Sequence, residues 1–83
     1  MDYVQVRLEV PAIESRYELF LPSFMPVGQM LDLLRKAVTE LSEGRYMPSG
    51  TEYLCSGEMG NRFMESVPLQ DYGIRNGDCL FMI

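Results

Sequence analysis

The most informative segment of this sequence is Val67-Pro-Leu-Gln-Asp-Tyr-Gly-Ile-Arg-Asn-Gly-Asp-Cys-Leu-Phe-Met-Ile83. Its first part, Leu69-x-Asp71-Tyr72-x-Ile74, predicts a short turn that places two aliphatic side chains in a core. A tight reversal at Asn76-Gly77-Asp78 then leads into a final strand, because these residue types tolerate the backbone conformations that tight turns require. In the turn, Tyr72 is placed to hydrogen-bond a backbone group of the preceding loop, and Gly73 permits a positive φ.

Two stretches near the N-terminus predict a first β-hairpin. Apolar and polar residues alternate over 4–10 and again over 16–21, with a turn between them at Pro11 to Ser15. After Pro26 the apolar period changes to 3.6 residues and continues to about Ser42, which predicts one amphipathic helix.

The second half is predicted to contain three shorter strands. Tyr53-Leu54-Cys55 is interpreted as a third strand, Arg62-Phe63-Met64 as at most a stub of a fourth, and Cys79 to Ile83 as a fifth. Gly44 to Thr51 is predicted to be a loop, and Ser56 to Asn61 a turn. This order predicts an α+β roll, a five-stranded mixed sheet with one helix packed across it. The first and last strands are expected to be parallel neighbours in the sheet centre.

The same patterns predict which side chains form the core. The expected core residues are Val4, Val6, Leu8, Tyr17, Leu19, Val27, Met30, Leu31, Leu34, Val38, Leu69, Ile74, Leu80 and Met82. Both cysteines are expected to be reduced, with Cys55 directed to the core and Cys79 to the outer face. A shift of the short third strand by one residue would bring both thiols to the same face.

Composition and charge exclude several classes of partner. The chain has 83 residues and a formal net charge of −5, with 47% hydrophobic residues. Duplex nucleic acids and anionic membranes select for clustered Lys and Arg, so neither is expected to bind. No apolar run reaches the roughly 18 residues that span a bilayer, and residues 1–5 hold neither a basic leader nor an apolar signal core. We therefore expect one cytoplasmic domain, residues 1–83, without direct membrane insertion.

The element order and the motif Leu69-Gln-Asp-Tyr-Gly-Ile74 resemble ubiquitin, which has a Leu-x-Asp-Tyr-x-Ile turn before its last strand. The chain is still more similar to the small bacterial ubiquitin-like proteins typified by YukD and EsaB. These have a Pro-Val pair at the start of the helix, here Pro26-Val27, and an Asp-x-Gly-Ile-x-Asn-Gly-Asp-x-Leu run, here Asp71 to Leu80. They also end shortly after that run without a glycine tail, as this sequence does at Ile83.

The resemblance implies a ubiquitin-like β-grasp fold and a cytoplasmic accessory protein of a type VII (ESX-like) secretion system in a Gram-positive bacterium. It implies that the partner is a larger protein of the secretion machine, for example the cytoplasmic domain of a membrane-anchored component.

The residues offer no catalytic, cofactor or metal site. Histidine is absent, which removes the commonest general base and metal ligand. Two cysteines without histidine satisfy no tetrahedral zinc pattern, and neither has an adjacent base to activate it. We therefore expect a protein that is not an enzyme and needs no cofactor.

Two function hypotheses remain, both without covalent conjugation through the C-terminus. That chemistry and sulfur-carrier chemistry need an extended terminal Gly-Gly, and the sequence ends on Ile83. The first hypothesis is an adaptor that binds a secretion machine. The alternative is another ubiquitin-fold scaffold domain, or a tail-less relative of a sulfur-carrier or conjugation protein. Neighbouring genes would discriminate between them.

A candidate protein-binding surface follows from strand alternation. With Leu80 and Met82 directed inward, Phe81 and Ile83 lie on the outer face of the sheet, where polar residues are usual. Leu54 and Phe20 are expected to lie on the same face. The functional interpretation is an apolar patch that docks a partner through Phe81. The alternative is a few scattered exposed hydrophobic residues, which are common on protein surfaces.

Overall fold

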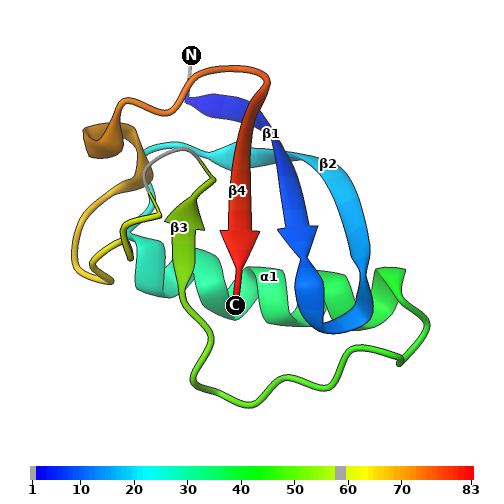
Figure 1. The fold of residues 1–83 in the computed structure, drawn as a ribbon. Helices are drawn as coiled ribbons and strands as arrows, with labels where there is room; N and C mark the ends of the chain where they lie inside the picture. Colours follow the sequence, from blue (N-terminus) through cyan, green and yellow to red (C-terminus); the bar gives the residue numbers. More distant parts are fainter. Residues whose placement is uncertain (1, 58–59) are drawn as a thin grey trace.

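A four-stranded mixed sheet and one α-helix form the fold (Figure 1). The computed structural model describes residues 2–57 and 60–83. The sheet consists of β1 (Tyr3–Val10), β2 (Ser15–Pro22), β3 (Leu54–Ser56) and β4 (Asp78–Met82). Its strand order is β2-β1-β4-β3, with β1 antiparallel to β2 and parallel to β4, as the sequence predicts for the first and last strands.

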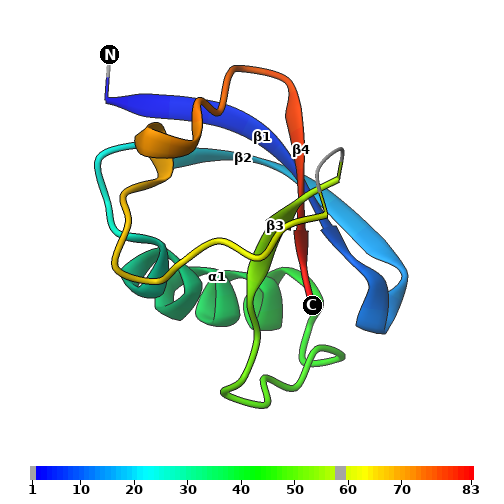
Figure 2. The ribbon, with the colours of Figure 1, turned by 60° about the vertical axis from the view of Figure 1, so that its left-hand side comes forward.

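The helix α1 (Val27–Leu41) crosses one face of the sheet, as Figures 1 and 2 show from two directions. It begins after Pro26, in agreement with the prediction. Its first backbone amides would otherwise have no partner. The N–H of Val27 donates to the carbonyl of Val67 at 3.0 Å, and that of Gly28 donates to Glu65 at 2.9 Å. The segment before the C-terminal motif therefore holds the start of the helix.

The core lies between α1 and the sheet. Its buried members agree with most of the predicted set, but Tyr17, Leu19 and Ile74 are only partly buried against it. The sequence-based set also lacks several residues of the buried cluster, namely Val10, Leu21, Tyr46, Leu54 and Phe63. Tyr46 and Phe63 belong to irregular segments, where no periodicity indicates which side chains point inward.

Two predictions about the sheet are wrong. Among the described residues it has four strands, because the predicted stub at 62–64 forms only an isolated bridge between Arg62 and Cys55. The phase of β3 is also shifted by one residue from the prediction. Leu54 pairs with the inward-facing Met82 and is fully buried, so Cys55 lies on the outer face beside Phe81.

The C-terminal motif forms the predicted turn, but of its two aliphatic side chains only Leu69 is fully buried, since Ile74 is partly buried against the core. Leu69 is buried at the start of a 3-10 helix, η2 (Leu69–Tyr72), and Gly73 follows with φ of 69°. The Tyr72 hydroxyl accepts a hydrogen bond from the N–H of Met64 at 2.7 Å, and its ring stacks on Phe63 with 4.1 Å between centroids. The predicted turn at 56–61 includes Glu58 and Met59, which lie outside the described residues.

Candidate protein-binding site

The outer face of β3 and β4 brings together side chains that are distant in sequence. Cys55 lies opposite Phe81 in the antiparallel β3–β4 register. Beyond the end of each strand, Tyr53 and Ile83 exchange two backbone hydrogen bonds, of 2.8 and 2.9 Å. Side chains alternate along a strand, so Tyr53 and Ile83 share the face of Phe81. We call Tyr53, Phe81 and Ile83 the outer-face patch.

The three side chains of the outer-face patch differ in how firmly they are held. Ile83 is 51% exposed, whereas Phe81 and Tyr53 are half-buried. The ring of Phe81 lies against the backbone of Gly57, where an added Cβ would stand 2.6 Å from the ring edge. The Arg62 guanidinium lies 4.9 Å from the centre of the Tyr53 ring, within the range of a cation–π contact. The two aromatic rings are therefore positioned before any partner binds.

Of the four predicted site residues, Leu54 is excluded and Phe20 lies elsewhere. The buried Leu54 cannot contact a partner, and its place on the outer face is taken by Cys55, which is 6% exposed. Phe20 is on β2, opposite Gln5 of β1, and so is two strands away from Phe81. Only Phe81 and Ile83 of the predicted set lie together.

Sequence reasoning missed Tyr53 because the phase of β3 was wrong. Tyr53, Leu54 and Cys55 are all apolar or weakly polar, so this stretch contains no alternation that fixes which residue points inward. The one polar neighbour that could indicate the phase is Glu52, which precedes them. A Glu is normally expected to point outward, but Glu52 is itself buried and so gives the wrong phase.

Neither cysteine on this face has the properties of a nucleophile. Both are free thiols in the structure, although the outer face holds both of them. Burial raises the pKa of Cys55, and burial together with the negative charge of Glu9 raises the pKa of Cys79. The Cys79 Sγ lies 3.9 Å from Glu9 Oε2. Because only the thiolate attacks, these shifts favour the protonated and less reactive form of both thiols.

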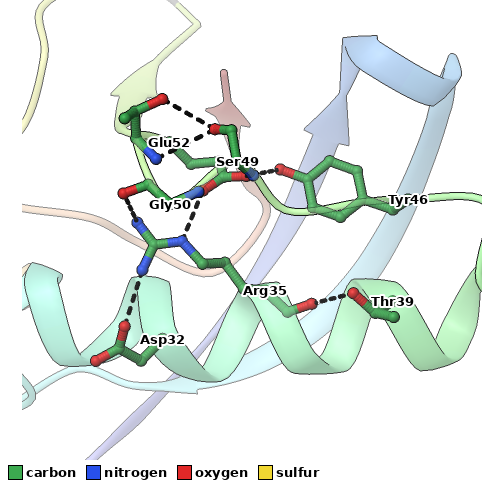
Figure 3. A network of polar contacts seen from close by, with 8 residues as sticks. Asp32, Arg35, Thr39, Tyr46, Ser49, Gly50 and Glu52 are labelled. Atoms are coloured by element: carbon green, nitrogen blue, oxygen red, sulfur yellow. Dashed lines mark hydrogen bonds and ion pairs between the residues drawn. The ribbon is translucent and has the colours of Figure 1, made fainter.

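A buried carboxylate supports the segment that leads into β3 (Figure 3). Glu52 Oε1 accepts hydrogen bonds from Arg35 Nε at 2.6 Å and from the N–H of Gly50 at 3.1 Å. Its Oε2 accepts from the Tyr46 hydroxyl and from the N–H of Ser49, both at 2.7 Å. Four donors thus surround a side chain that is only 4% exposed.

The charges of this network are set by its hydrogen bonds. Burial alone would raise the pKa of Glu52, but the hydrogen bonds from Tyr46, Arg35 and backbone amides outweigh it and lower the pKa to about 2. Burial and the hydrogen bond to Glu52 raise the pKa of Tyr46 above its ordinary value. The hydrogen bond to Glu52 raises the pKa of Arg35, which also contacts Asp32 at 2.8 Å. Glu52 is therefore ionised at neutral pH, and Tyr46 remains a hydrogen-bond donor.

The network has a positioning role. It ties residues 46–52 to the middle of α1 and so fixes the approach of the chain to Tyr53 and β3. Both oxygens of the Glu52 carboxylate are engaged by these donors.

Comparison with known proteins identifies the fold. No family model matches the sequence. No curated protein sequence matches it significantly. The ubiquitin-like domain of the Mycobacterium tuberculosis type VII secretion system protein ECCD1 matches with a TM-score of 0.79 and 17% identity, over 100% of this chain and 99% of that chain.

Two further solved structures extend the comparison. A chain of the MycP5-free ESX-5 inner membrane complex matches with a TM-score of 0.75 and 20% identity, over 100% of this chain but only 21% of that chain. The ubiquitin of Caldiarchaeum subterraneum matches with a TM-score of 0.67 and 20% identity, over 98% and 91% of the two chains. The chain therefore has a ubiquitin-like α+β fold, with one helix and a mixed sheet. Within residues 2–57 and 60–83, no helix has the length and apolarity that crossing a bilayer requires.

Proposed function

We propose that this chain is a non-catalytic adaptor of a type VII secretion system, acting in the cytoplasm of a Gram-positive bacterium by binding another protein. The observation that carries the proposal is the match with the ECCD1 domain over the full length of both chains. The second match lies within an ESX-5 inner membrane complex, which supports a larger component of such a machine as the partner. The sequence resemblance to YukD and EsaB points to the same system.

The outer-face patch is the proposed docking surface. Aromatic side chains dominate the energetics of most protein interfaces, and Phe81 and Tyr53 are both partly exposed and held in place. Ile83 adds an exposed aliphatic side chain beside them. A partner that covers this patch would bury apolar area without first ordering these rings.

A second candidate is a ubiquitin-fold scaffold domain outside secretion, related to sulfur-carrier or conjugation proteins. The match with an archaeal ubiquitin supports this alternative. Genes for an FtsK/SpoIIIE-type ATPase and small WXG-type proteins next to this one would favour the adaptor. Neighbouring genes for adenylating enzymes would favour the alternative.

Co-purification with the neighbouring secretion components tests the adaptor and its surface together. We expect Ile83→Asp and Phe81→Asp to reduce recovery of the partner at least about tenfold, the loss typical of a hot-spot residue. Phe81→Asp also loses the contact with Gly57, so Ile83→Asp is the cleaner variant. Met47→Asp, at a side chain that is 84% exposed and outside the patch, is the matched control. Equal recovery with all three variants would exclude the outer-face patch, and recovery of no secretion component by the unmodified protein would exclude the adaptor.

A further inference from the structure

The two edges of the sheet differ in how the chain protects them. The outer edge of β3 is covered, because the N–H of Phe63 donates to the Leu54 carbonyl at 2.8 Å and Arg62 bridges to Cys55. β2 runs along eight residues, Ser15–Pro22. Other segments contact only its two ends, where the Pro22 carbonyl accepts from the N–H of Met25 at 3.3 Å and Ser15 Oγ accepts from Arg45 at 3.1 Å. Within 2–57 and 60–83, no other segment hydrogen-bonds to the outer backbone edge over residues 16–20. A long uncovered edge can pair with another extended chain.

The register shows which backbone groups this edge presents. The N–H of Ser23 donates to the Asp2 carbonyl, which makes these two residues a hydrogen-bonded pair. Such pairs alternate along an antiparallel ladder. The backbone N–H and C=O groups of Tyr17 and Leu19 therefore bond to β1, while those of residues 16, 18 and 20 point away from it. Gln5, opposite Phe20, directs its own backbone groups to the other side, toward residues 76 and 77.

The side chains at the open edge carry specific chemistry. Arg16, Glu18 and Phe20 are all exposed, and neither Arg16 nor Glu18 forms an ion pair within the described ranges. Phe20 is 71% exposed. Tyr3 lies diagonally across from it on the same face and packs edge-to-face on Phe24, with 6.5 Å between ring centroids. The edge thus presents a positive charge, a negative charge and an aromatic cluster in order.

We infer that the open edge of β2 binds an extended segment of a partner protein as an additional antiparallel strand. Directly opposed residues of opposite charge stabilise neighbouring strands. The segment that fits has an apolar residue opposite Phe20, a basic residue opposite Glu18 and an acidic residue opposite Arg16. In chain direction its outward-facing pattern is apolar-x-basic-x-acidic. This surface lies at the β2 edge of the sheet, whereas the outer-face patch lies over β4 and β3 at the other edge. It is therefore a second interaction surface that does not depend on the first.

Amide hydrogen exchange measured by NMR tests this inference with a defined probe. The probe is the capped synthetic peptide Thr-Ile-Thr-Lys-Thr-Glu-Thr, and the control peptide exchanges its Lys and Glu. For a dissociation constant of about 1 mM, about 5 mM peptide should slow exchange of the amides of residues 16, 18 and 20 roughly sixfold. The amides of Tyr17 and Leu19 already bond to β1 and should not change. The control peptide should give clearly less protection.

Variants at one position separate the backbone contact from other effects. Glu18→Pro removes an outward N–H that β1 does not use, so the fold should persist while protection by the peptide is lost. Glu18→Ala keeps the N–H and should retain most of the protection. Phe81→Asp should leave the protection unchanged, which distinguishes this surface from the outer-face patch. Absence of protection in the unmodified protein would overturn the inference. Protection that rises with protein concentration without peptide would replace it with self-association.

Discussion

Two irregular connections flank β3, and they are held to the rest of the molecule by different forces. The segment before it, residues 42–53, is fixed by the ionised carboxylate of Glu52 and its four donors. The segment after it, residues 60–72, is fixed by the buried Phe63 and Leu69 and by backbone hydrogen bonds to the start of α1. We therefore call residues 42–53 the polar latch and residues 60–72 the apolar latch. They should respond differently to pH and to truncation of side chains.

Phe63→Ala should produce the largest loss of stability, because it removes the most bulky fully buried side chain and the ring that stacks on Tyr72. We expect the free energy of unfolding to fall by about 3–5 kcal/mol, measured by urea denaturation. Met64→Ala is the control, since the adjacent side chain is 64% exposed and should change the free energy by less than about 0.5 kcal/mol. Equal effects of the two substitutions would contradict the apolar latch.

Glu52→Gln should have the second largest effect. Removing one partner of a buried ion pair costs several kcal/mol, but Arg35 keeps its contact with Asp32. We therefore expect a loss of about 2–3 kcal/mol at pH 7. Glu40→Gln, on the exposed face of α1, is the matched control and should change little. If Glu52→Gln left the free energy of unfolding unchanged, the polar latch would be contradicted.

The pH dependence of stability should distinguish the polar latch from the apolar one. The pKa of Glu52 is lowered from 4.5 to about 2 on folding, so its contribution is complete above pH 4.5 and is lost as the pH falls toward 2. The shift corresponds to roughly 3 kcal/mol. The difference in unfolding free energy between the unmodified protein and Glu52→Gln should therefore shrink on acidification, while the effect of Phe63→Ala should stay nearly constant. A difference that does not depend on pH would mean that Glu52 is not ionised in the folded state.

The same contrast explains what the sequence could predict. The helix, β1, β2 and β4 follow from periodicity within a few residues, and so do the positions of Phe81 and Ile83 on the outer face. Glu52 could not be identified in this way. Its burial depends on Arg35, which lies 17 residues earlier, and a lone Glu in a loop is ordinarily a surface residue. The prediction of the phase of β3 failed for a related reason. In a strand of three residues, the pairing with β4 decides which side chains point inward, and the sequence pattern of the strand does not.

Tyr72→Phe should have the smallest effect of the series, and it separates the hydroxyl of Tyr72 from its ring within the apolar latch. It removes the hydroxyl that accepts the hydrogen bond from the N–H of Met64 but leaves the ring stacked on Phe63. Water can replace the lost acceptor at this exposed amide, so the free energy of unfolding should fall by only about 0.5–1 kcal/mol. Tyr17→Phe is the control, because within the described residues no hydrogen bond involves that hydroxyl. The melting temperature of Tyr72→Phe should therefore be slightly lower than that of Tyr17→Phe. If Tyr72→Phe instead cost as much as Phe63→Ala, the hydroxyl and not the ring stack would hold residues 60–72, and both connections would be polar latches.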